Sequence, residues 1–386
     1  MKTTGYLNTT FVQQIMQDQF PDQIIAVQGI TLLDVDNSAS ILVALTATQT
    51  ESCIGHFGLE VNYTINGLPQ NKRMVMKIKP HGQEIVNMLN MLSQLCGDEL
   101  NRVYEQFKYL TGFYYTHLKE QEIYRKLHPV FTPVIYGLYT NQQEDIYVIL
   151  MEYLDEVDLL NTVMAPEKWS DQHIKAALKQ MAVWHSKMLN KVEDVDLSIW
   201  KDAPCLQQMT ELLPLWNALL NNAADKFPEL YDPLRVKTMR TAIQEIPNYW
   251  QQLEKLPKTL VHNDFNPRNS CFKTQNGEIE FCLYDWELAT FHIPQYDLAE
   301  FLCFILDQDR YDQRYAYTEY YREELARLTG KYNSAPSFHQ ELYMATLDFG
   351  IHRMGLYMMA HSVSPYPFLP RVVNSFFNAI SGHSLN

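Results

Sequence analysis

Four polar residues that suit one kind of chemistry lie close together in the chain. His262, Asp264 and Asn269 belong to the segment VHNDFNPRNSCF, and Asp285 follows the apolar run 279–284. A carboxylate such as Asp264 can accept the proton of a hydroxyl group, and the oxygens of Asn269 and Asp285 can bind Mg²⁺. An amide ligand adds no negative charge beside the phosphates of a nucleotide. The set therefore predicts transfer of a phosphoryl group from Mg²⁺-bound ATP to a hydroxyl.

A polar hairpin is the other interpretation of this stretch. Asn263, Asn266 and Pro267 favour turns, and Asn276-Gly277 is a strong hairpin turn between two strands. These preferences explain the turns. They do not explain the spacing H-x-D-x-x-x-x-N followed by a second aspartate, which is the spacing of a kinase catalytic loop. We therefore interpret the stretch as a catalytic loop followed by a metal-binding aspartate.

The same segments resemble the aminoglycoside phosphotransferase and choline kinase superfamily, which consists of small-molecule kinases with a protein-kinase-like fold. The resemblance is specific over residues 258–305 and looser over 70–190. It rests on His262-Asn263-Asp264 with Asn269, on Asp285-Trp286-Glu287 and on Tyr296-Asp297-Leu298-Ala299. Most phosphotransferases of the group have glycine before the catalytic aspartate, where this chain has Asn263. This asparagine, together with Glu287 in a D-x-E rather than a D-x-D sequence, resembles the choline and ethanolamine kinase branch. The resemblance implies Asp264 as the catalytic residue, with ATP and Mg²⁺, and leaves the acceptor open.

Other residues of these segments have expected roles around the loop. We expect His262 to hold the backbone of the loop and Asp297 to do the same from behind. Glu287 is either a further metal ligand, beside Asn269 and Asp285, or a structural support. Arg268 either contacts a phosphate or stabilises the loop.

The first part of the chain predicts an antiparallel sheet after a helical or irregular cap over residues 1–29. The strand patterns are Ile30–Val35, Ile41–Thr48, Phe57–Ile65 and Arg73–Lys79, the last two joined by a turn-rich connection over 66–71. Residues 81–128 then read as helical, which is longer than a kinase requires at this point. A two-lobed α+β fold results, with residues 1–151 as the nucleotide-binding lobe and 152–386 as a mainly helical lobe that carries the catalytic loop and the acceptor site.

A lysine on the last of these strands is expected to bind the α- and β-phosphates of ATP. Met74, Met76 and Ile78 share one face of the strand, and Lys77 and Lys79 share the other face, together with Val75. Lys77 lies inside the strand and matches the strand lysine of the family, with Lys79 as the alternative and a solvated strand face as the simpler interpretation.

Glu120 is the expected partner of this lysine. It falls on a helical stripe of packing residues, where a carboxylate requires a cationic partner. Glu122 lies off the stripe and is expected to be solvated.

Two further segments are predicted to contact the nucleotide. The loop 50–56, with Ser52 and Gly55, would cover the triphosphate through its backbone N–H groups, although a plain hairpin loop also fits. The apolar strand Ile146–Met151 would lead into the connection between the lobes, where the backbone near Glu152 and Leu154 would meet the adenine.

The C-terminal half predicts helices. His185 lies on a buried stripe and reads as a core histidine rather than a catalytic one. Helices are expected over Gln313–Thr329, ending at Gly330, and from a capping box at Ser337 and Gln340 through Met359.

Tyrosines and carboxylates of 311–324, with Tyr343, Asp348 and Tyr357, are predicted to wall an acceptor pocket for an ammonium group. The acceptor would then be an amino alcohol or an aminoglycoside. The alternatives are inward-packed tyrosines with a neutral acceptor, or a nucleotide-binding pseudokinase that acts as an interaction module.

Composition limits the remaining classes. The net charge of −14 argues against nucleic acid and against anionic membranes as partners, and it weakly favours a cationic acceptor. The longest apolar run, near Ile41–Leu45, is too short to span a bilayer, and the N-terminal segment predicts no signal peptide.

The six cysteines show no C-x-x-C pairing, so we expect reduced thiols in a cytoplasmic protein without a zinc site. After Asp285 the chain lacks the D-F-G to A-P-E pattern of protein kinases, which makes a peptide acceptor unfavourable.

Overall fold

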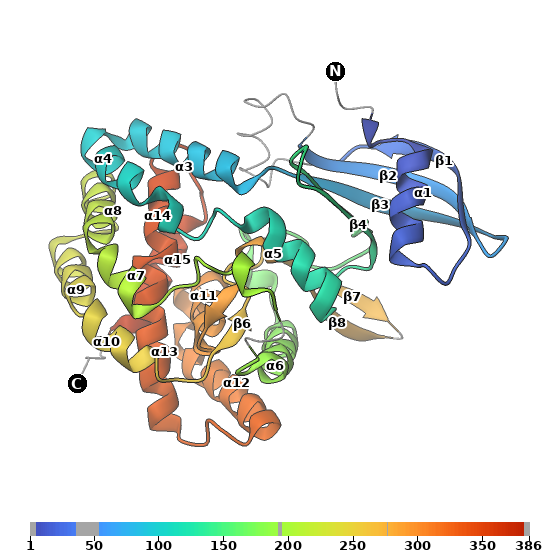
Figure 1. Ribbon diagram of the computed structural model, residues 1–386. Coiled ribbons are helices and arrows are strands. Elements are labelled where there is room, and N and C mark those ends of the chain that lie inside the picture. Colours follow the sequence, from blue (N-terminus) through green and yellow to red (C-terminus); the bar gives the residue numbers. More distant parts are fainter. Residues whose placement is uncertain (1–4, 36–53, 192–194, 276, 382–386) are drawn as a thin grey trace.

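The computed structural model describes residues 5–35, 54–191, 195–275 and 277–381. A twisted antiparallel sheet lies at one end of the molecule, and a larger body of helices forms the rest (Figure 1). This is the two-lobed, kinase-like α+β fold that the sequence predicts. The predicted strand Ile41–Thr48 falls outside the described residues.

Five described strands form this sheet, in the order β1-β2-β3-β5-β4, and neighbouring strands are antiparallel. The strands are β1 (Ile25–Leu33), β2 (Gly55–Ile65), β3 (Leu68–Lys79), β4 (Ile135–Asn141) and β5 (Ile146–Glu152). Helix α1 (Thr9–Gln19) begins at the N-cap Asn8 and packs against one face, where Ile15 and Met16 are buried. The N-terminal segment is therefore a helix followed by the first half of β1.

The hairpin between β2 and β3 is tighter than the sequence pattern predicts. Its turn consists of Asn66 and Gly67 alone, with φ angles of 52° and 82° that suit a two-residue turn. Strand β3 consequently begins at Leu68 instead of Arg73. Pro69 and Asn71 favour turns and therefore predict a longer loop, but they lie in the exposed first half of β3.

Strand β3 presents two chemically different faces, as predicted. Met74, Met76 and Ile78 belong to the apolar cluster under α1. Lys77 and Lys79 point to the opposite face, toward the helical body, where both make ion pairs.

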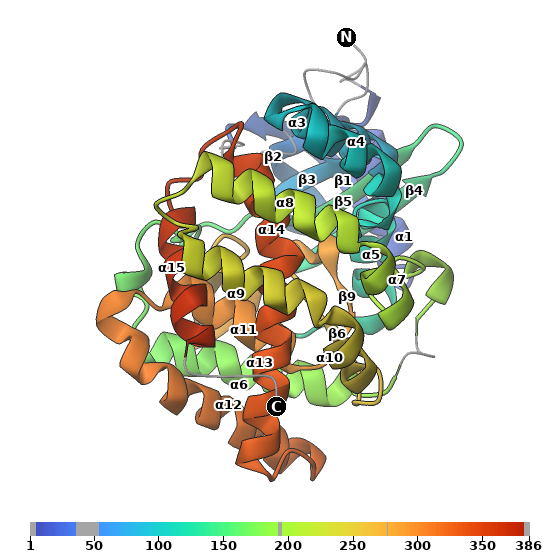
Figure 2. The same ribbon diagram turned by 90° about the vertical axis from the view of Figure 1, so that its left-hand side faces the viewer.

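The helical body is built from helices of both halves of the chain. They are α3 (Gly82–Cys96), α4 (Asp98–Phe107), α5 (Thr116–Glu122), α6 (Asp171–Met188), α7 (Leu206–Glu211), α8 (Leu213–Lys226), α9 (Pro233–Gln244), α10 (Ile246–Leu253), α11 (Gln295–Ile305), α12 (Arg314–Thr329), α13 (Ala335–Ile351), α14 (Arg353–His361) and α15 (Leu369–Ile380). Helices α3 and α4 pack beside α8 and α14 (Figures 1 and 2). The lobe boundary at residue 151 stays a proposal, since α3 and α4 precede it in the sequence but pack on the C-terminal helices α8 and α14.

The catalytic segment lies on short strands between these helices. Strand β6 (Thr259–Val261) pairs with β9 (Thr290–His292), and β7 (Ser270–Gln275) pairs with β8 (Glu278–Leu283). The β7–β8 hairpin was predicted. Residue Asn276 of its turn lies outside the described residues.

Helix α12 ends at Gly330 in a left-handed conformation, as predicted. The helix that follows differs from the sequence prediction in where it begins and in its length. Helix α13 is capped by Ser334, whose side chain accepts a hydrogen bond from the Ser337 N–H, because Pro336 fits the first turn of a helix. The predicted continuous helix through Met359 is interrupted at His352.

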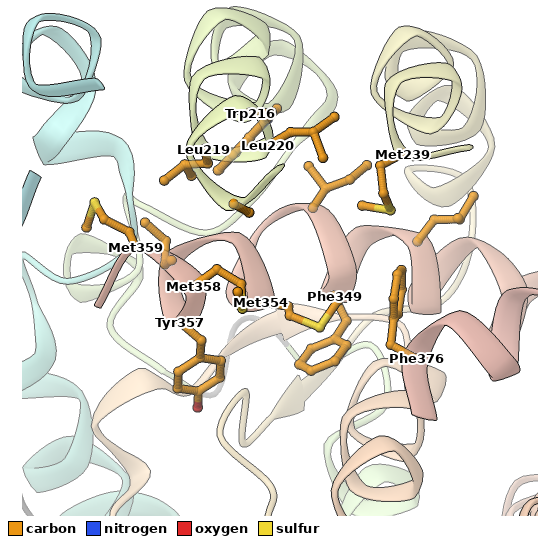
Figure 3. Packing of buried hydrophobic residues seen from close by; sticks show 14 of the residues in the cluster. Trp216, Leu219, Leu220, Met239, Phe349, Met354, Tyr357, Met358, Met359 and Phe376 are labelled. Atoms are coloured by element: carbon orange, nitrogen blue, oxygen red, sulfur yellow. The ribbon is translucent and has the colours of Figure 1, made fainter. Parts of the chain in front are cut away.

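A large apolar cluster holds α8, α9, α13, α14 and α15 together. Trp216, Leu219 and Met358 pack between α8 and α14, whereas the Tyr357 hydroxyl points away from these residues (Figure 3). This packing fixes the face that α14 turns toward the catalytic loop.

Among the described residues, none of the helices has the length and apolarity needed to cross a membrane. The five cysteines in the described ranges, Cys96, Cys205, Cys271, Cys282 and Cys303, are free.

Candidate active site

The loop 262–269 is held from behind by Asp297 on α11. Its two carboxylate oxygens accept hydrogen bonds from the backbone N–H groups of His262 and Asn263, at 2.7 and 2.9 Å. His185 on α6 lies 3.1 Å from the same carboxylate and is fully buried. Asn263 has a φ of 60°, a conformation that asparagine and glycine tolerate better than other residues. Asparagine therefore fits a position where most phosphotransferases of the resembling group have glycine.

Hydrogen bonds tie this loop to the end of strand β8. His262 Nε2 lies 2.9 Å from the Tyr284 carbonyl oxygen, and the Tyr284 N–H donates to the Asn269 carbonyl oxygen at 3.0 Å. The Asn263 side chain donates to the Leu288 carbonyl oxygen at 2.8 Å. Asp285 is consequently placed next to the loop although it lies 16 positions after Asn269 in the sequence.

The Asp264 carboxylate has different neighbours at its two oxygens. Oδ2 accepts from the Asn269 amide at 2.6 Å. Oδ1 accepts from Arg353 at 3.0 Å, from Arg268 at 3.3 Å and from the Tyr357 hydroxyl. Burial alone would raise the pKa of Asp264, but the two guanidinium groups and the Tyr357 hydroxyl outweigh it and hold that pKa well below its usual range.

Two lysines and three carboxylates form the other half of the site. Lys77 Nζ lies 2.8 Å from Glu120 and 2.5 Å from Asp285, so the predicted ion pair with Glu120 is present. Lys79 Nζ lies 2.6 Å from the same oxygen of Glu120 and 3.0 Å from Glu287. Burial opposes ionisation of Glu120, but Lys77 and Lys79 lower its pKa to about 2. The geometry therefore assigns an ion-pair role to both lysines.

The carboxylates of Glu120, Asp285 and Glu287 offer oxygens that all lie within 4.8 Å of one another. The Asn269 amide nitrogen is engaged by Asp264, which leaves the amide oxygen as the ligand atom. Oxygen donors of this kind fit Mg²⁺, which is a hard cation. Burial and the nearby Asp285 raise the pKa of Glu287, and a bound cation would offset this repulsion.

Residues 62–330 match the model of the Phosphotransferase enzyme family, APH. The chain belongs to this family. It is a small-molecule phosphotransferase, a member of the superfamily that its catalytic segment resembles.

Similar solved structures include an ethanolamine kinase of Plasmodium vivax, with 13% identity and a TM-score of 0.43 over 91% of this chain and 80% of that chain. A microcompartment-associated aminopropanol kinase has 10% identity and a TM-score of 0.42 over 91% and 90% of the two chains. An aminoglycoside-3'-phosphotransferase of type VIII has 12% identity and a TM-score of 0.38 over 91% and 94%. A comparison with curated proteins found no match.

The predicted nucleotide contacts of this phosphotransferase are described only in part. Ser52 lies outside the described residues, and Gly55 begins β2 with a φ of 145°, which favours glycine. Glu152 ends β5, and its carboxylate lies 2.6 Å from Lys273 on β7. Leu154 follows in the half-buried connection to the helical body. Their contacts with ATP stay predictions.

Two expectations about charged and aromatic residues are wrong. Glu122 is buried, not solvated, and its carboxylate pairs with Lys126 at 2.5 Å.

The tyrosines of α12 do not wall the site, because α12 packs on α6. The buried hydroxyl of Tyr321 on α12 lies 2.5 Å from His185. Asp348 accepts hydrogen bonds from Tyr249 and Trp250 in the interior. Of the tyrosines named for the acceptor pocket, Tyr357 contacts Asp264 through its hydroxyl.

Arg353 and Glu300 are site residues that the sequence did not reveal. Arg353 reaches Asp264 across 89 positions of the chain, and Glu300 accepts from the Asn266 amide at 3.4 Å. Neither belongs to a recognisable motif. Only the packing of α14 and α11 behind the loop brings them there.

Replacing Asp297 with alanine is expected to destabilise this phosphotransferase by about 3 kcal/mol or more. The change leaves two buried backbone N–H groups without an acceptor, and each such group costs roughly 1–3 kcal/mol. Urea unfolding measures the loss. Asp171→Ala is the control, because Asp171 is an exposed partner of Lys175. Equal stability of Asp297→Ala and the control would show that Asp297 does not support the loop.

Proposed function

We propose that the chain transfers the γ-phosphate of ATP to a hydroxyl group of a small molecule. The observation that carries this proposal is the meeting of two separate groups of residues. The loop with Asp264 and Asn269 is hydrogen-bonded to the end of β8, whose Asp285 is paired with Lys77 of the sheet. A proton acceptor, oxygen ligands for a metal and a phosphate-binding lysine are the groups that phosphoryl transfer requires.

Each residue has a specific task in the proposed reaction. Asp264 orients the acceptor hydroxyl and receives its proton as the oxygen attacks the γ-phosphorus and ADP departs. Lys77, held by Glu120, binds the α- and β-phosphates. Asn269, Asp285 and Glu287 would hold Mg²⁺, which when bound would neutralise charge on the phosphate oxygens. The backbone near Glu152 and Leu154 meets the adenine, and the loop that contains Ser52 and Gly55 covers the triphosphate.

A labelled-phosphate assay tests the proposal. The purified chain is incubated with γ-labelled ATP, Mg²⁺ and a panel of hydroxylated amines, acids and neutral alcohols, and products are identified by mass spectrometry. We expect Mg²⁺-dependent transfer to at least one member of the panel. Binding of Mg²⁺·ATP without transfer to any compound would favour the pseudokinase alternative.

The acceptor class predicted from the sequence is an amino alcohol or an aminoglycoside. The ethanolamine and aminopropanol kinases among the similar structures bear names of such compounds, and the net charge of −14 is compatible with a cationic acceptor. The structure removes the α12 tyrosines from this argument. The charges that surround Asp264 therefore carry more weight than the net charge. A cytoplasmic location stays a prediction from the sequence.

A further inference from the structure

We propose that the acceptor carries an anionic group, a carboxylate or a phosphate, close to the hydroxyl that is phosphorylated, and that Arg268 binds this group. The inference rests on the proposed function, in which Asp264 faces the acceptor hydroxyl. It goes further by assigning the chemical class of the acceptor.

The position of the arginines relative to Asp264 separates them from the metal ligands. Asn269, a proposed metal ligand, is bonded to Oδ2 of Asp264. Arg268 and Arg353 both contact Oδ1, the other oxygen. The arginines thus lie on the side of the carboxylate that is turned away from the metal ligand. In the proposed function the metal and the triphosphate would occupy the side of Asn269, so a hydroxyl substrate would reach Asp264 from the side of the arginines.

The two guanidinium groups share a single carboxylate oxygen. Within the described residues, neither Arg268 nor Arg353 forms an ion pair with any other acidic side chain. Arg353 is only 4% exposed, and its Nε has no hydrogen-bond partner in the described structure. Buried cations are costly unless they are paired and hydrogen-bonded, so the site has capacity for a second anion.

The remaining acidic group beside the loop does not fill this role. Glu300 is fully buried and its carboxyl is bonded to the Asn266 amide, not to an arginine. Burial and the repulsion of Asp264 raise the pKa of Glu300, against the opposing effect of Arg353, and thereby favour its uncharged form.

Aromatic rings hold the Arg268 guanidinium in place. Its centre lies 5.3 Å from the Tyr357 ring, 5.4 Å from Phe368 and 6.0 Å from Phe304. Asn266 accepts from its Nε at 3.1 Å. A guanidinium fixed in this way loses little entropy when it binds a carboxylate or a phosphate. Its Nη1 group is the donor left for such an anion, because Nε is bonded to Asn266 and Nη2 to Asp264 and Tyr357.

The exposure of the two arginines distinguishes their tasks. The Arg268 side chain is 18% exposed and reaches the surface of the site, whereas the Arg353 side chain is 4% exposed. Arg353 is stacked on Tyr357, at 4.9 Å, and on Phe113, at 5.7 Å. Arg268 is therefore the residue that contacts the anion, and Arg353 positions Asp264 and Tyr357 behind it.

Small hydroxyl compounds of matched size and different charge provide the test. The probes are glycerate, glycerol 3-phosphate, glycerol and 1-amino-2-propanol, with kcat and KM measured for each and for ATP. We expect one of the two anions to have a kcat/KM at least about tenfold higher than glycerol and aminopropanol, because a charge-assisted pair contributes this much. The comparison of glycerate with glycerol 3-phosphate identifies the anionic group.

Arg268→Gln is expected to raise the KM for the preferred anion by about ten- to a hundredfold while the KM for ATP changes less than about twofold. Arg268→Lys, which keeps the charge, should recover part of the loss. The control is Arg73→Gln. It removes an exposed ion pair in which Arg73 on β3 lies 2.8 Å from Asp155, which follows β5. Thermal unfolding of each variant shows that it is folded.

Three results would overturn the inference. A wild-type preference for glycerol or aminopropanol would leave the kinase in place and exclude an anionic acceptor. A higher KM for ATP in Arg268→Gln, with an unchanged KM for the acceptor, would assign Arg268 to the nucleotide. The third result is calorimetric: no binding of either anion to the protein loaded with Mg²⁺ and a non-hydrolysable ATP analogue. Anion binding that depends on Arg268, without transfer to any compound, would support the inference and contradict the proposed function.

Discussion

Asp264→Asn is expected to lower phosphoryl transfer by about a hundred- to ten-thousandfold while Mg²⁺·ATP binding changes little. A general base contributes a factor of this size, and the amide of asparagine cannot accept the hydroxyl proton. The nucleotide is bound by other residues, chiefly Lys77 and the metal ligands. Turnover and calorimetric ATP binding, measured on the same protein, separate the two effects.

The surroundings of Asp264 require a stability control for this variant. Its carboxylate is the acidic partner of both Arg268 and Arg353, and removal of one member of a buried ion pair costs roughly 3–5 kcal/mol. Asp171→Asn, which alters an exposed pair with Lys175, serves as the matched variant. A folded Asp264→Asn protein with turnover near that of wild type would show that another group receives the proton.

The sequence predicts much of the fold because the relevant signals are local. Alternation of apolar and charged residues in β3 predicts which face holds Lys77, and the structure confirms it. Gly330 ends α12 as predicted, since glycine adopts the left-handed conformation at low cost. The start of α13 was misplaced because Ser337 and Ser334 both suit a helix cap, and only the position of Pro336 in the first turn favours Ser334.

The site is predictable where the spacing of a single segment determines the geometry. His262, Asp264 and Asn269 lie on one loop, so their mutual position follows from its turns. The Lys77–Glu120 pair was predictable from burial, because a carboxylate on a packed helical stripe needs a cation.

Arg353 could not be found in this way. Its contact with Asp264 depends on how α14 packs against α8, a property of the whole apolar cluster in Figure 3. The tyrosines of α12 were assigned to the acceptor pocket for the converse reason. Their composition suggested a cation site, but composition does not show which face of a helix is buried.

The ion pairs of Asp285 give it a role in both charge balance and metal binding. It is paired with Lys77 at 2.5 Å, and Glu287 and Glu120 supply further oxygens nearby. Its φ of 66° lies in the left-handed region, which aspartate and asparagine enter more readily than most residues.

Asp285→Ala is therefore expected to weaken Mg²⁺·ATP binding and to lower kcat/KM by at least about a hundredfold, since a bound metal supplies several kcal/mol of transition-state stabilisation. Titration of Mg²⁺ against nucleotide binding is the measurement. Asp285→Asn is the matched variant, because asparagine tolerates the left-handed backbone and keeps one oxygen but lacks the charge. If charge is what the metal requires, Asp285→Asn should resemble Asp285→Ala in its Mg²⁺ dependence while unfolding closer to wild type. An unchanged Mg²⁺ dependence in both variants would mean that Asp285 only holds Lys77 in place.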